Sequence, residues 1–173
     1  EIIKHLNNKV NQKFFEIVHT EDIVKSTDSP LEAAKRGKKT SMWLSIESVK
    51  NKETDIVISA GNTGALLVIS KLNLKMIESI DKPALSALWP NKKGMSVVLD
   101  LGANIECNSK NLVDFSLMGA SLYKSLYPNE NPNVALLNIG SEELKGNEII
   151  KETFQILNEK KNQNFNFSGY IEG

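Results

Sequence analysis

The sequence predicts an α/β protein with a doubly wound, mostly parallel sheet and helices on both faces. The first observation is a set of short, almost wholly apolar runs, which are typical of strands buried on both faces. The second is that segments with helical periodicity separate these runs, an alternation typical of parallel sheets covered by helices. The expected strands are Phe14–Val18, Asp55–Ser59, Ser96–Asp100 and Val134–Asn138.

Helices are expected between and after these strands. The last of them has an apolar stripe that runs from Ile149 to Leu157 along one face. The segments Ser26–Gly37 and Trp89–Gly94 are expected to be loops, and the final stretch FNFSGYIEG indicates a fifth strand. The expected helices are Ser41–Lys50, Gly64–Ile77, Lys110–Tyr127 and Asn147–Lys161.

The composition is that of a soluble globular protein and predicts a single α/β domain over residues 1–173. Lys plus Arg equals Asp plus Glu, at 21 each, so no net field attracts nucleic acid or an anionic membrane. The single cysteine, Cys107, excludes an internal disulfide and fits a reducing cytoplasm. No apolar run is long enough to span a membrane. Both ends look cut, which predicts that the chain is a fragment of a longer protein.

Small and polar residues form a loop after each of the last three complete strands. The first loop is residues 59–64, the second is residues 100–106 and the third is residues 138–147. Ligands of open parallel sheets bind outside the carboxyl ends of the strands, so the three loops are expected to converge on one site. The candidate binding residues are Ser59, Gly61, Asn62, Thr63 and Gly64 in the first loop, Asp100, Gly102 and Asn104 in the second, and Asn138, Gly140, Gly146 and Asn147 in the third.

Anion binding is the chemistry that suits these loops. A helix start presents unpaired N–H groups and the positive end of its dipole, and glycine lets a phosphate or carboxylate come close to them. The side chains of Asn62, Thr63 and Asn104 add hydrogen-bond donors, and Lys145 is the only cation in the loops. Neither G-x-G-x-x-G nor G-x-x-x-x-G-K-[ST] occurs, so the sequence does not predict an NAD site.

Structural explanations compete with several of these assignments. The glycines also fit tight turns between strand and helix, and Asp100 and Asn138 also fit helix or turn caps. Lys145, taken alone, fits a solvated loop lysine. A lone cysteine without a nearby base, such as Cys107, is more often inert than nucleophilic. His19 is expected to be structural.

Three longer motifs carry a family resemblance. The stretches ISAGNTGALL, LDLGANIECNSKNLVDFSLMGAS and NPNVALLNIGSEELKGNEIIKETFQIL closely resemble the phosphate acyltransferases of bacterial phospholipid synthesis, in the same order. The resemblance runs over essentially all 173 residues and covers the central portion of that family. It implies a fold similar to that of isocitrate and isopropylmalate dehydrogenases. Glu106 stands where the family commonly has aspartate.

The resemblance also implies a reaction. Members of this family reversibly transfer a fatty acyl group from acyl-acyl carrier protein to inorganic phosphate, and the acyl phosphate then goes to a membrane glycerol-3-phosphate acyltransferase. They are homodimers, need no metal or other cofactor, and are cytoplasmic with a loose attachment to the membrane. The acyl donor is the phosphopantetheine thioester of the carrier protein. The resemblance assigns Lys145 as the catalytic cation.

This chemistry agrees with the residues present. Phosphate is already anionic near neutral pH, because its second pKa is about 6, and a thiol of pKa about 8.5 leaves readily as thiolate. The reaction therefore needs position and charge neutralisation rather than a strong base. The backbone N–H groups of Gly61–Gly64 and Gly102–Asn104 are expected to hold the phosphate.

The sequence leaves other functions open. The chain is alternatively a carrier-protein-binding or dimerising fragment without catalysis, or a related transferase that uses acyl-coenzyme A. A basic cluster either docks the acidic carrier protein or is a solvated helix end. This cluster consists of Lys35, Arg36, Lys38 and Lys39.

Overall fold

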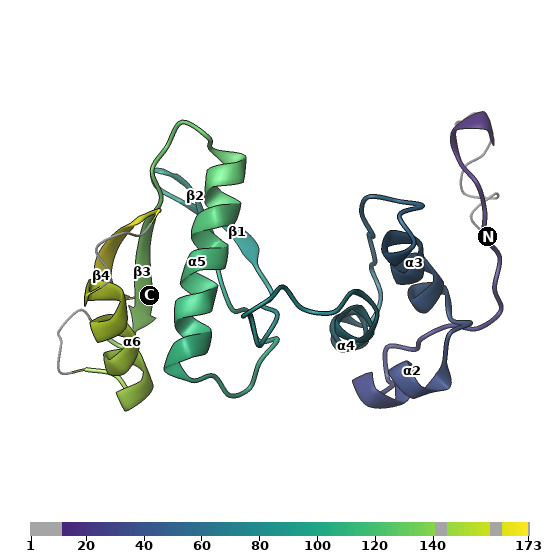
Figure 1. Ribbon diagram of the computed structural model, residues 1–173, viewed down its shortest axis with the longest axis horizontal. Coiled ribbons are helices and arrows are strands. Elements are labelled where there is room, and N and C mark those ends of the chain that lie inside the picture. Colours follow the sequence, from purple (N-terminus) through teal and green to yellow (C-terminus); the bar gives the residue numbers. More distant parts are fainter. Residues whose placement is uncertain (1–11, 141–144, 160–163, 173) are drawn as a thin grey trace. The chain divides into compact units, whose positions relative to one another are not determined.

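The computed structural model describes residues 12–140, 145–159 and 164–172 (Figure 1). The chain divides into two compact units, Glu1–Lys75 and Met76–Gly173, and each is described by itself. The expectation of one α/β domain over the whole chain stays a prediction. Among the described residues, no helix combines the length and the apolar composition that crossing a bilayer requires.

The first unit consists of helices joined by extended segments. Its elements are η1 (Gln12–Phe14), α2 (Pro30–Arg36), α3 (Ser41–Lys50) and α4 (Thr63–Leu74). Polar caps start the two longer helices, because Thr40 accepts a hydrogen bond from the Trp43 N–H and Asn62 accepts one from the Ala65 N–H. Helix α4 contacts both α2 and α3. The core of this unit is Ala33, Met42, Trp43, Ile46, Ala65 and Ile69.

Helix α2 lies where a loop was expected, so that prediction is wrong. Ser29 caps the helix by accepting from the Glu32 N–H, and its hydroxyl in turn donates to the Glu32 carboxylate at 3.0 Å. Pro30 stands at the first helical position, where its missing N–H costs nothing. These start signals outweighed the Ser- and Asp-rich composition that indicated a loop.

The predictions of strands at Phe14–Val18 and Asp55–Ser59 are also wrong. Phe14 belongs to η1 and its side chain is 82% exposed, and Ile58 is 89% exposed. Of the second segment only Val57 packs against the core. An apolar run forms a strand only where another strand accepts its hydrogen bonds, and no described strand pairs with either segment.

The second unit begins with a β-hairpin. Strands β1 (Ala87–Asn91) and β2 (Gly94–Val98) pair antiparallel, with Asn91 opposite Gly94 and only Lys92 and Lys93 in the turn. The strand expected at Ser96–Asp100 therefore starts and ends earlier, and most of the loop expected at Trp89–Gly94 is strand. This leaves Asp100 outside the sheet.

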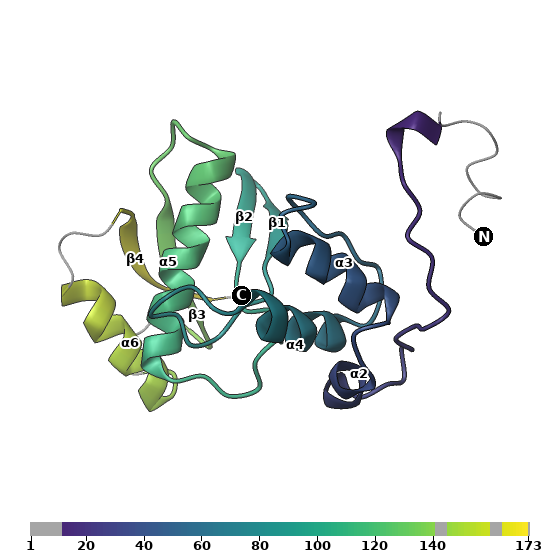
Figure 2. The same cartoon turned by 45° about the vertical axis from the view of Figure 1, so that its right-hand side comes forward.

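A parallel βαβ unit follows. Strand β3 (Asn133–Asn138) pairs with β4 (Asn166–Glu172), and α6 (Glu148–Glu159) connects them (Figure 1). Helix α5 (Ser109–Leu126) contacts α6, β2 and β3, and these elements lie side by side in Figure 2 as well. The core of this unit is Val113, Ala120, Leu136, Leu157 and Phe165.

The structure confirms an α/β protein and the four expected long helices as far as they are described. It also confirms the strand at Val134–Asn138 and the strand near the C-terminal end. The described residues hold two two-stranded sheets, one antiparallel and one parallel. The doubly wound arrangement stays a prediction.

Candidate functional site

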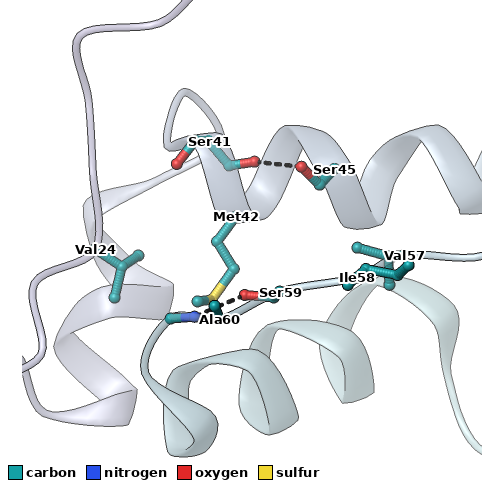
Figure 3. A pocket seen from close by; sticks show the side chains of 9 residues that line it. Val24, Ser41, Met42, Ser45, Val57, Ile58, Ser59 and Ala60 are labelled. Atoms are coloured by element: carbon teal, nitrogen blue, oxygen red, sulfur yellow. Dashed lines mark hydrogen bonds between the residues drawn. The ribbon is translucent and has the colours of Figure 1, made fainter. Parts of the chain in front are cut away.

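The first loop forms one wall of a cavity of about 280 Å³ within the first unit (Figure 3). The opposite wall is the first part of α3, and the Met42 side chain points from α3 toward Ser59 and Ala60. No described residue with a charged side chain lines this cavity. Its lining residues are Val24, Ser41, Met42, Ser45, Val57, Ile58, Ser59, Ala60 and Gly61.

Protein atoms lie close to two glycines of the first loop and leave little room for a side chain there. A Cβ on Gly61 would lie 3.0 Å from the Met42 Cε, and a Cβ on Gly64 would lie 2.7 Å from the Pro30 Cγ. The second distance is shorter than any ordinary carbon–carbon contact. Close packing therefore requires glycine at residue 64 whether or not a ligand binds there.

The Asn62 side chain joins the start of α4 to an earlier segment. Its Oδ1 accepts from the Ala65 N–H at 3.0 Å, and its Nδ2 lies within hydrogen-bond distance of the Lys25, Ser26 and Asp28 carbonyls. Both donors and the acceptor are thus used inside the protein. The predicted donation from Asn62 to a ligand would require these bonds to break.

The N–H groups of Thr63 and Gly64 have no acceptor among the described residues. They lie at the first two positions of α4. The neighbouring Gly61 N–H donates to the Ser59 hydroxyl at 3.2 Å. Unpaired N–H groups at the start of a twelve-residue helix are the kind of donor that binds an anion.

The second loop is organised around the Asp100 carboxylate. Its Oδ1 accepts from the N–H groups of Leu85 and Ala103, at 2.8 and 3.1 Å. Its Oδ2 accepts from the N–H of Asn104 at 2.8 Å and from the Asn104 Nδ2 at 2.9 Å. Asp100 therefore caps the loop, and a role in binding a ligand stays a prediction. Gly102 has a φ of +89°, which favours glycine.

The pKa of the Asp100 carboxyl is lowered by this environment. Partial burial acts to raise the pKa, but the hydrogen bonds from the Asn104 side chain and from the Leu85, Asn104 and Ala103 N–H groups together outweigh it. The carboxylate is thus ionised in the folded protein at all moderately acidic and neutral pH values.

Replacing Asp100 by asparagine is expected to lower the free energy of unfolding by about 1–3 kcal/mol at neutral pH, because the partly buried N–H and Nδ2 groups of Asn104 would face an NH₂ group instead of the Asp100 Oδ2. Because the pKa of Asp100 is lower in the folded state, the ionised carboxylate stabilises the fold at any pH above the pKa of the unfolded state. This stabilisation is lost as the pH falls through the pKa of the folded state. The difference in the free energy of unfolding between wild type and Asp100→Asn should therefore become smaller below about pH 4. Urea unfolding from about pH 7 down to about pH 2 measures it, and a difference independent of pH would contradict this role.

A second cavity, of about 410 Å³, lies beside the second loop. Lys82 reaches it from a distant part of the sequence, and its Nζ donates to the Glu106 carbonyl at 2.5 Å. Lys82 is not among the predicted site residues, because nothing local relates a lysine to a loop that follows 24 residues later. The lining residues are Lys82, Ala103, Asn104, Ile105 and Glu106.

The third loop holds Lys145 through its backbone. The Asn138 Nδ2 donates to the Lys145 carbonyl at 3.0 Å, and the Asn138 Oδ1 accepts from the Ile139 N–H at 2.9 Å. Gly146, with a φ of +97°, lies against the same Asn138 side chain. Asn147 caps α6 by accepting from the Ile150 N–H. Residues 141–144 of this loop lie outside the described residues.

The predicted site residues thus fall into two groups. The first loop lies in the first unit, and the second and third loops lie in the second unit. Gly140 is buried at the end of β3, Thr63 and Ser59 are exposed, and Lys145 is exposed. Convergence of all three loops on one site stays a prediction, as does the binding role of each residue.

Residues outside the loops have structural explanations. His19 pairs with Glu21 at 2.8 Å on the surface. Arg36 of the basic cluster pairs with Asp28 at 2.9 Å, and the cluster is exposed at the end of α2. No group of three or more His, Cys, Asp or Glu residues among the described ones is placed to hold a metal. The absence of a metal or cofactor in the reaction stays a prediction.

Comparison of the sequence with known proteins shows the family. The chain belongs to the fatty acid synthesis protein family, whose model matches residues 1–173. The chain is 73% identical, over its full length, to a protein named phosphate acyltransferase from Pelagibacter ubique. It is 46% identical over 158 residues to proteins of the same name from Maricaulis maris and Bradyrhizobium diazoefficiens. The predicted resemblance to phosphate acyltransferases is thereby confirmed.

The chain spans about half the length of these relatives. It covers 52% of the Pelagibacter protein and 45% of each of the other two, while 100% and 91% of the chain are matched.

Proposed function

We propose that this chain is part of a phosphate acyltransferase that reversibly transfers a fatty acyl group from acyl-acyl carrier protein to inorganic phosphate. The observation that carries the proposal is the 73% identity over the whole chain with a protein of that name. The family description, fatty acid synthesis protein, supports an acyl substrate. The product, an acyl phosphate, would serve phospholipid synthesis.

The first loop supplies the phosphate site in this proposal. The unpaired N–H groups of Thr63 and Gly64 hold phosphate oxygens at the positive end of the α4 dipole. No described residue that lines the cavity beside this loop is charged. The N–H groups at the start of α4 are therefore the groups that attract the negative charge of phosphate. The phosphate is thus positioned as a nucleophile that needs no base.

Lys145 supplies the charge that the reaction requires. When a phosphate oxygen attacks the thioester carbon, the carbonyl oxygen becomes an oxyanion, and the thiolate then leaves as the carbonyl re-forms. The Lys145 ammonium stabilises this oxyanion or the attacking phosphate by a charge-assisted hydrogen bond. Asn138 positions the Lys145 backbone through the bond at 3.0 Å.

A full-length protein can test this function. In the Pelagibacter ubique relative, the segment that matches this chain is replaced by residues 1–173, which gives a protein called the chimera below. Acyl-acyl carrier protein and phosphate are added, and acyl phosphate is trapped with hydroxylamine. We expect hydroxamate formation that requires both substrates. Product from acyl-coenzyme A but not from the carrier-protein thioester would instead support the coenzyme A alternative.

Because the chain matches only about half of the relative, a second candidate function is favoured for the chain alone. A 173-residue protein that covers 52% of an enzyme is expected to bind the carrier protein or a second copy without turnover. Hydroxamate formation by the chimera but not by the chain alone would support this candidate. The homodimer, the cytoplasmic location, the loose membrane attachment and delivery of product to a membrane glycerol-3-phosphate acyltransferase belong to the same proposal for the longer protein.

A further inference from the structure

The side-chain amide of Asn104 is fixed in one orientation. Its Nδ2 lies 2.7 Å from the Pro83 carbonyl oxygen and 2.9 Å from the Asp100 Oδ2. A peptide carbonyl and an ionised carboxylate only accept hydrogen bonds, so the amide NH₂ must face both of them. The lowered pKa of Asp100 keeps that carboxylate an acceptor at neutral pH.

Asn104 therefore offers an acceptor and not a donor to a ligand. The Asn104 Oδ1 makes no hydrogen bond to another described residue. The backbone N–H groups of Ala103 and Asn104, which were expected to hold phosphate, already donate to Asp100. Phosphate oxygens need donors, so this part of the loop is unsuited to phosphate.

The cavity beside the loop has the remaining properties of a site for an uncharged chain. Its wall combines the Ala103 and Ile105 side chains, and Ile105 is fully exposed. Lys82 and Glu106 carry opposite charges on the same wall, and the Lys82 ammonium donates to the Glu106 carbonyl. The wall as a whole thus has no net charge to attract an anion.

We propose that this cavity binds an uncharged chain containing an amide N–H, which donates to the Asn104 Oδ1, and that Asp100 is the positioning residue for Asn104. Within the proposed function, on which this inference rests, that chain is the pantetheine arm of the acyl donor. It contains secondary amides and little charge between its phosphate and its thiol. The second loop then recognises the acyl donor, while phosphate binds elsewhere.

Titration of the isotope-labelled chain followed by NMR tests the assignment. Pantetheine is expected to shift the Asn104 side-chain signals and the backbone signals of residues 103–106, and inorganic phosphate is expected to leave them unchanged. A pantetheine analogue with N-methylated amides has a similar shape but no N–H to donate. It should bind about fivefold more weakly, the loss of one net hydrogen bond.

Variants separate recognition from folding. Asn104→Ala should weaken pantetheine binding by about fivefold, while Asn129→Ala, the same change at an exposed turn residue, should have no effect. In the chimera, Asn104→Ala should raise the KM for the acyl donor and leave the KM for phosphate unchanged. A general loss of structure would change both values.

Three results would overturn the inference. These are a response of residues 103–106 to phosphate, equal binding of the N-methylated analogue, and no response to pantetheine at all. Hydroxamate formation by the chimera is measured separately. An active chimera combined with any of these three results would leave the proposed function standing and remove only the assignment of this cavity.

Discussion

Replacing Lys145 by alanine in the chimera is expected to lower the rate of acyl phosphate formation by about 10²–10³-fold, the usual cost of losing one contact to a developing oxyanion. The hydrogen bond that the Lys145 backbone carbonyl accepts from the Asn138 Nδ2 at 3.0 Å is retained in alanine. Thermal unfolding of the variant checks that the fold persists. Hydroxamate formation at saturating phosphate and acyl donor measures the rate.

Two further variants make this result specific. Lys145→Arg keeps the positive charge and is expected to recover part of the rate, although the guanidinium differs from the ammonium in size and hydrogen-bond geometry. Lys92→Ala removes one positive charge from the exposed turn of the hairpin and should leave the rate unchanged. An undiminished rate in Lys145→Ala, with normal thermal unfolding, would remove Lys145 from the mechanism.

Local signals explain what the sequence predicted correctly about the fold. Helix α3 has the expected bounds because Thr40 is a strong cap and Asn51 follows the last helical turn. Helix α5 begins with a capping box between Asn108 and Asn111. The expected strand at Asp55–Ser59 failed because strand formation depends on a partner that composition does not reveal.

The same distinction applies to the candidate site. The sequence indicated which loops carry small and polar residues, and it left open whether Asp100 is a cap or a ligand. The capping contacts involve the N–H of Leu85 and the carbonyl of Pro83, which approach the loop from an earlier segment. Likewise, residue 64 must be glycine because of Pro30, which lies on helix α2, much earlier in the sequence. Tertiary contacts of this kind decide which groups remain available to a substrate.

Gly146→Ala is expected to cause a large loss of stability in the third loop. A φ of +97° disfavours any residue with a Cβ, at a cost of about 1–3 kcal/mol. The new methyl group would also lie 2.6 Å from the Asn138 Oδ1, and this overpacking adds about 1–3 kcal/mol. Urea unfolding of the chain measures the sum.

Gly102→Ala is the matched control, because Gly102 has a similar φ of +89° but no atom within 4 Å of a Cβ built on it. It should show the conformational cost alone, so the difference between the two variants isolates the contact with Asn138. That contact also holds the Lys145 carbonyl, so displacing the Asn138 side chain moves the backbone of Lys145. Gly146→Ala should therefore reduce the rate of the chimera even at temperatures where it stays folded, because small displacements of a charged group weaken oxyanion stabilisation. Equal losses of stability in the two variants, or a normal rate in folded Gly146→Ala, would show that Asn138 does not position Lys145.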